Sequence, residues 1–295
     1  MSNDIPALPC YLNGEFSTVR DAKVSVLDRG FIFGDGVYEV VPAYEGRPFR
    51  FQEHMARLER SLGELRITNP MDRQGWRQLV DQLVAAYAKH VGKQPQDTNQ
   101  LVYLQVTRGV AMRDHVMPKD IAPTVFAMVN RLYIYTPEER ARGVDCYTAD
   151  DFRWKKGHIK SISLAAAVLA RQVSADQDGN ETIMFRDGFL SEAAASNVWV
   201  VKDGKVLGAP RDNLVLEGIR YGLLEELCQE AGIPFELRRV SREEVLAADE
   251  ILLSSATKEI LPCTRLDGRP VGNGRPGPIY EKLFAGYQQA KRSTT

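Results

Sequence analysis

Apolar positions along the first 130 residues follow two spacings, one typical of strands and one typical of helices. Strand-like apolar runs cover residues 10–16, 24–26, 37–44, 101–107 and 124–130. Helices are predicted at residues 52–66 and 73–91, where apolar residues recur every three or four positions. An Asn13-Gly14 turn and a polar loop at residues 108–123 interrupt the pattern. This part of the chain is therefore expected to mix strands and helices.

The second half of the chain is predicted to be rich in β-hairpins. Asp187-Gly188 and Asp203-Gly204 each separate two apolar runs, as in a two-residue hairpin turn. Strands are expected at residues 144–148 and 250–254, and helices at 219–231, at 278–290 and from Lys160 onward, with Ile162, Leu169 and Val173 in register. Hairpins are too frequent for a regular βαβ sheet, so the pattern predicts an α+β fold.

A chain of 295 residues is long enough for two domains. Residues 132–137 read as an extended link, because Pro137 disfavours helix before it and begins a helix-like segment. We therefore expect a smaller N-terminal α/β domain at residues 1–131, a linker at 132–137 and a larger, β-rich C-terminal domain with flanking helices at 138–295.

Composition narrows the class of protein. The 38 Lys and Arg nearly balance the 39 Asp and Glu, which gives no electrostatic reason to expect nucleic acid or an anionic membrane as partner. No apolar run approaches the length of a membrane-spanning helix, and the first residues lack the pattern of a signal peptide. The four cysteines stand singly and the four histidines show no ligand spacing, which predicts reduced thiols, no metal and a cytoplasmic location.

Two residues suggest cofactor chemistry. Lys160 follows an extended segment and precedes an apolar-periodic one, a junction where a partly desolvated lysine can act as a nucleophilic amine. Glu192 is expected near the end of a hairpin strand, where its carboxylate could reach a bound heterocycle. An amine that can form a Schiff base and a carboxylate for a ring nitrogen are what pyridoxal 5'-phosphate (PLP) requires of a protein.

Six segments in order, residues 28–39, 53–57, 105–109, 113–115, 159–161 and 192–197, carry a resemblance. From Tyr11 to about Gln288 the chain resembles the branched-chain and D-amino-acid aminotransferase family, the PLP enzymes of fold type IV. Within that family it is most similar to the D-amino-acid aminotransferases. The resemblance implies a two-domain fold-type IV architecture and a homodimer with shared active sites.

The resemblance also implies roles for individual residues. Lys160 would form the Schiff base with PLP and move the substrate's Cα proton. Glu192 would pair with the pyridine nitrogen, Arg57 would bind the phosphate, and Leu216 would pack under the ring, although Leu216 could equally be core. Arg153 would lie near the phenolic oxygen, or simply stack against Trp154.

The remaining phosphate contacts are expected from two backbone segments. The amides of Ile219 and Arg220 open a helix and would form an anion site, and Ser255, Ala256 and Thr257 would add a further wall. The chain departs here from its relatives, which commonly carry a hydroxyl residue at Ala256 and a threonine at Arg220. Donation by these two side chains is therefore not expected, whereas their backbone amides remain.

Substrate recognition is assigned by resemblance to Tyr38, Arg113 and His115, which would bind the α-carboxylate, the last two from the partner subunit. The implied reaction is transamination between a D-amino acid such as D-alanine and a 2-oxo acid, either 2-oxoglutarate or pyruvate, in a ping-pong cycle. An L-branched-chain aminotransferase, an R-selective amine transaminase, an aminodeoxychorismate lyase and a non-catalytic PLP-binding protein are the alternatives. Phe33, Val40, Ala195 and Lys258 are the positions considered for the side-chain pocket.

Overall fold

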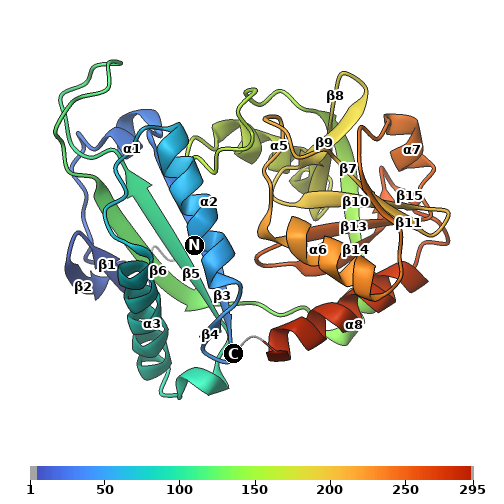
Figure 1. The fold of residues 1–295 in the computed structure, drawn as a ribbon, viewed down its shortest axis with the longest axis horizontal. Helices are drawn as coiled ribbons and strands as arrows, with labels where there is room; N and C mark the ends of the chain where they lie inside the picture. The colour runs from blue at the N-terminus through green and yellow to red at the C-terminus, as the bar shows by residue number, and fades with distance from the viewer. Residues whose placement is uncertain (1–4, 294–295) are drawn as a thin grey trace. The chain divides into compact units, whose positions relative to one another are not determined.

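The computed structural model describes residues 5–293, which fall into two compact units (Figure 1). Unit 1 holds residues 5–133 together with Ile159–Leu164. Unit 2 holds Ile134–His158 and residues 165–293. The chain therefore enters unit 2, returns to unit 1 for one short segment and enters unit 2 again. That short segment contains Lys160.

Unit 1 is built on a six-stranded antiparallel sheet in the order β2-β1-β6-β5-β3-β4. Its strands are β1 (Pro9–Leu12), β2 (Glu15–Thr18), β3 (Gly36–Tyr44), β4 (Arg47–Pro48), β5 (Gln100–Thr107) and β6 (Thr124–Arg131). Alternate residues of the three central strands face one core, which is the period of two expected for a sheet with one covered face.

Two long helices of unit 1, α2 (Phe51–Glu64) and α3 (Arg73–His90), pack on that core. Met55, Leu58 and Leu62 recur on one face of α2 and are fully buried, as the apolar spacing predicted. The side chain of Asp72 accepts a hydrogen bond from the amide of Gly75 and so caps α3. A short helix, α1 (Arg29–Phe33), and a 3-10 turn, η1 (Pro95–Asp97), complete the unit.

The polar connection between β5 and β6, residues 108–123, extends away from the sheet at the upper left of Figure 1. It pairs with the segment before α1, because Asp28 and Val110 form an isolated bridge. The strand predicted at residues 24–26 is wrong, since these residues are irregular and their two valines are exposed. Three alternating residues are too short a signal to fix a strand without a partner strand.

Unit 2 contains a nine-stranded mixed sheet, in the order β12-β11-β10-β13-β14-β7-β8-β9 with β15 paired to β14. Its strands are β7 (Val144–Asp150), β8 (Glu181–Arg186), β9 (Phe189–Ala193), β10 (Asn197–Lys202), β11 (Lys205–Gly208), β12 (Phe235–Leu237), β13 (Glu250–Ser255), β14 (Glu259–Leu266) and β15 (Arg269–Pro270). The predicted hairpin turns are confirmed, with Asp187, Gly188, Asp203 and Gly204 all at positive φ.

The helices of unit 2 are α4 (Pro137–Arg142), α5 (Ala165–Ala175), α6 (Ile219–Glu230), α7 (Arg242–Leu246) and α8 (Pro278–Ser293). The helix expected to start at Lys160 begins only at Ala165, so Ile162 is not helical. Leu169 is 62% exposed rather than buried. The reason is tertiary, because residues 161 and 162 bond to the beginning of β3 instead of to a helical turn.

Two sheets with helices packed on them confirm the expected α+β class. Across residues 5–293 no helix is long and apolar enough to cross a membrane. The same residues hold no group of three or more His, Cys, Asp and Glu side chains suited to a metal ion. The cysteines at positions 10, 146, 228 and 263 are all buried and free.

Candidate active site

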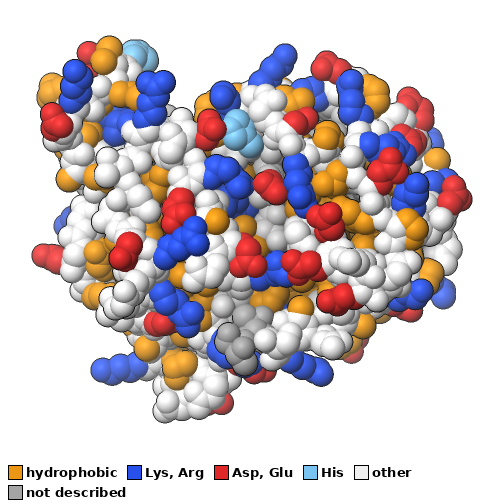
Figure 2. Space-filling model, in the orientation of Figure 1, with side chains coloured by type: hydrophobic (Ala, Val, Ile, Leu, Met, Phe, Trp, Pro, Cys, Tyr) orange, Lys and Arg blue, Asp and Glu red, His pale blue; other side chains and the backbone are white. Residues whose placement is uncertain are grey.

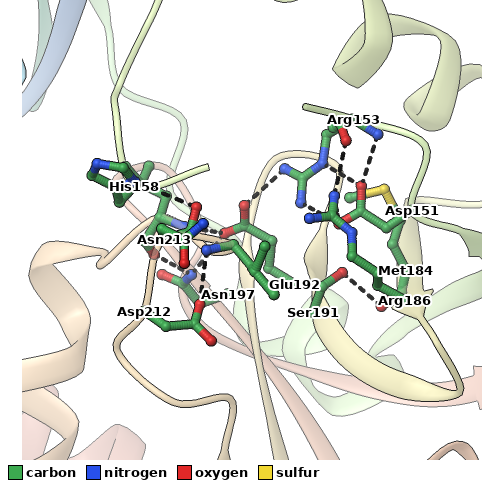
Figure 3. Close-up of polar contacts among 12 residues, drawn as sticks. Asp151, Arg153, His158, Met184, Arg186, Ser191, Glu192, Asn197, Asp212 and Asn213 are labelled. Atoms are coloured by element: carbon green, nitrogen blue, oxygen red, sulfur yellow. Dashed lines mark hydrogen bonds and ion pairs between the residues drawn. The ribbon is translucent and has the colours of Figure 1, made fainter. Parts of the chain in front are cut away.

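The carboxylate of Glu192 lies in the middle of a hydrogen-bond cluster in unit 2 (Figure 3). The residue, on β9, is 5% exposed. Its Oε1 accepts Nη1 of Arg153 at 2.7 Å, and its Oε2 accepts Nδ2 of Asn197 and the amide of Leu216, both at 3.1 Å. Burial raises the pKa of Glu192 to about 7, although Arg153 and the Leu216 amide act in the opposite direction. The carboxyl group is thus held rigidly and titrates near neutral pH.

Arg153 divides its donors between two carboxylates. Its Nε and Nη2 donate to the two oxygens of Asp151, each at 2.9 Å, while Nη1 reaches Glu192. Arg186 lies beyond Asp151, with Nη2 3.1 Å from Asp151 Oδ2. The four side chains form a series of alternating charges, and Figure 3 shows it with Glu192 near the centre.

The segment before α6 is fixed by Asn197. Its Nδ2 also donates to the carbonyl of Leu216 at 2.9 Å. A side chain at Gly218 would overlap Asn197 Oδ1, so the close approach requires glycine. Gly218 is the N-cap of α6 and gives no side-chain hydrogen bond to it. The first amides of a helix have no intrahelical acceptor, so the start of α6 offers donors to an anion.

The side chain of Arg220 lies elsewhere than its backbone. It is 2% exposed and donates from Nη2 to the hydroxyl of Tyr287 on α8. The guanidinium therefore ties α6 to α8. Ile219, the first residue of α6, is partly buried.

The predicted Ser255–Thr257 wall forms the turn between β13 and β14. Ser255 Oγ accepts the amide of Lys258 at 3.1 Å and lies 3.3 Å from Thr257 Oγ1. Lys258 Nζ in turn donates to the fully buried Glu181 at 3.0 Å. The ion pair of Lys258 with Glu181 thus helps to fix the hydroxyls and amides of this turn. Ala256, at its apex, contributes no hydroxyl.

Lys160 lies in unit 1, beside β3. Its carbonyl accepts the amide of Tyr38 at 3.0 Å, and its own amide donates to Ser61 Oγ at 3.2 Å. These bonds fix the backbone on both sides of the residue. The Nζ atom lies 3.9 Å from the centre of the Tyr38 ring. Lys160 and Tyr38, predicted separately as nucleophile and substrate contact, are therefore neighbours.

Arg57 belongs to a buried ionic cluster of unit 1. Its Nε and Nη2 donate to the two oxygens of Glu39 at 2.7 and 2.9 Å, and Glu39 also bonds Nδ1 of His54 at 2.8 Å. Burial would raise the pKa of Glu39, but Arg57 and His54 hold it well below its usual range. The bidentate pair sets the plane of the Arg57 guanidinium.

Arg113 and His115 lie on the exposed loop between β5 and β6, where they share Phe33 of α1. The Arg113 guanidinium is 5.4 Å from the ring centre of Phe33, and the His115 ring is 5.4 Å from it. Arg29 Nη1 donates to the carbonyl of Asp114 at 2.6 Å. The loop is thus attached to α1 close to the two predicted carboxylate contacts.

The predicted site residues therefore form separate local groups. In unit 2 the cluster around Glu192 includes Arg153 and Leu216, with Ile219 and Arg220 following at the start of α6. In unit 1 Lys160 lies with Tyr38, Arg57 with Glu39, and Arg113 with His115. Sequence reasoning gave no role to Asp151, Asn197, Glu39, His54 or Ser61, although all five bond a predicted site residue or its partner. Glu39, His54 and Asn197 lie within the segments that carry the resemblance, but the sequence does not show which residues they bond, because the fold sets the partners.

Comparison with known proteins gives consistent results. The family described as Amino-transferase class IV matches residues 36–266. The D-alanine aminotransferase of Bacillus licheniformis is 36% identical over 284 residues, 96% of this chain and 97% of that protein. That of Staphylococcus epidermidis is 34% identical over 279 residues, 95% and 96% of the two chains. The solved structure of a branched-chain amino acid aminotransferase from Escherichia coli has a TM-score of 0.84 at 23% identity, covering 96% of this chain and 94% of that one.

Proposed function

The chain belongs to the class IV aminotransferase family and is an aminotransferase, and from this premise we propose that its amino donor is a D-amino acid such as D-alanine. The acceptor would be 2-oxoglutarate or pyruvate, and the two half-reactions follow a ping-pong order. Two relatives that match nearly the full length of the chain carry the name D-alanine aminotransferase, which supports this choice of donor.

Pyridoxal 5'-phosphate is the cofactor that the donor set of this chain fits. It needs a primary amine, an acceptor for its pyridine nitrogen and several donors for its phosphate. Lys160 supplies the amine, Glu192 supplies a buried carboxylate, and the α6 amides and the turn at Ser255 supply donors. When bound, the cofactor supplies an electron-withdrawing ring that stabilises the negative charge left on Cα.

The observation that carries the proposal is the fixed carboxylate of Glu192. Its three hydrogen-bond donors come from three different segments, so movement of any one segment leaves two donors to hold the carboxylate in place. Glu192 would bind the pyridine nitrogen, and Leu216, whose amide bonds Glu192, would lie against the ring. Arg153 would reach the phenolic oxygen from its place beside Glu192.

The other residues would bind the ends of the cofactor and substrate. Lys160 would take the Cα proton and return it at the neighbouring cofactor carbon. Arg57, held in its plane by Glu39, would donate to the phosphate together with Ile219, Arg220 and the Ser255–Ala256–Thr257 turn.

Tyr38 would bind the substrate α-carboxylate together with Arg113 and His115 of the partner subunit. A guanidinium, an imidazole and a phenol can all donate to one carboxylate. The attachment of the Arg113 loop to Phe33 restricts where these donors can point. This arrangement favours an α-amino acid over a simple amine, which lacks the carboxylate.

A homodimer is part of the same proposal. Apolar side chains of the segment before α1, of α1 itself and of the β5–β6 loop are exposed on unit 1, namely Val24, Val26, Phe31, Met112 and Val116. Figure 2 shows hydrophobic side chains among charged ones where that loop extends at the upper left. A second copy of the chain would cover them. Sedimentation should give a dimer, and Met112→Asp should shift it towards monomer.

The four free cysteines suit a reducing, cytoplasmic compartment.

The test is the visible absorption spectrum of the purified protein before and after addition of D-alanine, with L-leucine and L-glutamate in parallel. A cofactor band that collapses with D-alanine alone supports the proposal. A band that responds only to an L-donor would assign the chain to branched-chain substrates, and a band that no donor changes would favour the lyase, the amine transaminase or the silent binder.

A matched pair of lysine variants tests the nucleophile. Lys160→Ala should lose about 10²–10⁴-fold or more of the transamination rate, because both the covalent attachment and the proton transfer are removed. Lys155→Ala, an exposed lysine five positions earlier, should leave the rate unchanged. Wild-type turnover in Lys160→Ala would overturn the assignment.

A further inference from the structure

The guanidinium of Arg153 donates hydrogen bonds to two carboxylates, but it gives more of them to one than to the other. Asp151 receives the Nε and Nη2 donors in a bidentate pair, whereas Glu192 receives Nη1 alone. The exposed fractions of the three side chains, Arg153, Asp151 and Glu192, are 14%, 0% and 6%, so water screens these contacts weakly. The electrostatic stabilisation of an ionised Glu192 by Arg153 therefore depends on how Asp151 positions the Arg153 guanidinium.

Among the groups around Glu192, Arg153 and Asp151 are the ones whose charges decide whether it is ionised. Asn197 and the Leu216 amide are neutral donors. Tyr221 also interacts with Glu192, and its own pKa is raised chiefly by burial, so its hydroxyl stays neutral. Arg186 acts on the far side, where it bonds Asp151 and the carbonyl of Arg153. Asp151 adds a negative charge that opposes ionisation of Glu192, while Arg153 favours it.

We infer that Arg153, besides its proposed contact with the phenolic oxygen, and Asp151, a positioning residue, set the charge of Glu192, and through it the proton on the pyridine nitrogen of the bound cofactor. The consequence for the cofactor rests on the proposed function, whereas the effect on Glu192 does not. An ionised Glu192 accepts a hydrogen bond from a protonated ring nitrogen, and a neutral Glu192 keeps the proton itself. Asp151, which acts through its bonds to Arg153, thereby adjusts how strongly the ring withdraws electrons.

Two substitutions should move Glu192 in opposite directions. Arg153→Gln removes the cation and should raise the midpoint of Glu192 titration by about 1–3 pH units. Asp151→Asn removes the competing carboxylate, releases Arg153 towards Glu192 and should lower that midpoint by about 1 unit. Opposite shifts cannot come from general loss of packing, which would act in the same way in both variants. Arg153→Lys keeps the positive charge and should stay close to the wild-type midpoint.

The first measurement is a ¹³C NMR titration of the full chain without cofactor, labelled at the δ carbon of glutamate. The resonance of Glu192 is identified as the one missing from the Glu192→Gln spectrum. Arg238→Gln is the matched control, because Arg238 pairs with Glu244 at a partly exposed site of the same unit and should leave Glu192 unchanged. Midpoints that do not move, or that move in the same direction in Arg153→Gln and Asp151→Asn, would overturn the inference.

The second measurement uses the protein loaded with ¹⁵N-labelled pyridoxal 5'-phosphate. The ring nitrogen should become less protonated in Arg153→Gln, where Glu192 becomes more protonated. It should become more protonated in Asp151→Asn, where Glu192 becomes less protonated. A nitrogen signal that ignores both substitutions would overturn the link to the cofactor. Failure of wild-type protein to bind the cofactor would count against the proposed function instead, and the first titration would still decide the role of the two residues. If Asp151→Asn does not fold, the comparison of Arg153→Gln with Arg153→Lys separates charge from packing.

Discussion

Each unit contains one buried glutamate bound to an arginine, and the two behave in opposite ways. Glu39 in unit 1 and Glu192 in unit 2 are 0% and 5% exposed. Both bond an arginine at 2.7 Å. Nevertheless the pKa of Glu39 lies well below the usual range, whereas burial raises the pKa of Glu192 to about 7. Burial and a nearby arginine are therefore not enough to determine the charge of a carboxylate.

The difference lies in how each arginine distributes its donors. Arg57 gives a fork of two donors to Glu39, and His54 adds a third contact. Arg153 gives its fork to Asp151 and only one donor to Glu192, and Asp151 adds a like charge nearby. A bidentate pair compensates for the loss of hydration, whereas a shared single bond does so incompletely. The first arrangement suits a structural ion pair, and the second leaves a proton that can be exchanged near neutral pH.

The largest effect is expected from Glu39→Ala. It leaves Arg57 buried without its counter-ion and should lower the free energy of unfolding by about 3–5 kcal/mol. The control is Glu59→Ala, which breaks the exposed pair with Arg73 and should cost about 0–1 kcal/mol. Urea unfolding of both variants measures the difference. Equal losses in the free energy of unfolding would mean that the buried Glu39 pair contributes no more to stability than the exposed Glu59 pair.

The pH dependence of the same pair follows from its lowered pKa. The stabilisation by Glu39 is present above its unfolded pKa, near 4.5, and is lost as the pH falls below that value. Glu39→Ala should therefore be less sensitive to acid than the wild type, relative to its own stability at neutral pH. Urea unfolding of both proteins at a series of acidic pH values measures the two slopes, and equal slopes would contradict the assignment to Glu39.

Glu192 should show the opposite slope. Its raised pKa means that the folded chain keeps a proton that the unfolded chain releases, so its contribution to stability is greatest below pH 4.5 and falls as the pH rises through about 7. The loss over this window should be about 3 kcal/mol. Thermal unfolding of the cofactor-free protein and of Glu192→Gln across this range isolates the contribution. A slope that persists unchanged in Glu192→Gln would assign it to other groups.

A smaller effect is expected at Gly218, which lets Asn197 approach Glu192. Gly218→Ala places a methyl group against Asn197 Oδ1 and should cost about 1–3 kcal/mol while shifting the titration of Glu192. Gly222→Ala is the matched control, four residues further along α6, where an added methyl meets no neighbour within 4 Å. It should stabilise the protein by about 0.5–1 kcal/mol, because alanine favours a helix interior. Two equal effects would show that Gly218 is not required for the close approach.

Local features were well predicted from the sequence. The hairpins at Asp187-Gly188 and Asp203-Gly204, the faces of α2 and α3 and the α+β class depend on turn chemistry and periodicity, which are local. The strand β14 was missed, because its pairing with both β13 and β7 buries it and hides any alternation. The start of α5 was placed too early for the opposite reason, since hydrogen bonds to β3 override the apolar spacing around Lys160.

Motifs determined the family and the residue types of the site, because an amine and a carboxylate in the right order limit the chemistry. Only the tertiary structure decided the partners of those residues. Asp151 is only two residues from Arg153, but the sequence does not indicate that it holds two of its donors, and nothing near Lys160 indicates Ser61. The charge of a buried carboxylate depends on donors, like charges and exclusion of water, and the fold brings these together from distant positions. The sequence therefore determined which groups are present, and the fold determined their protonation.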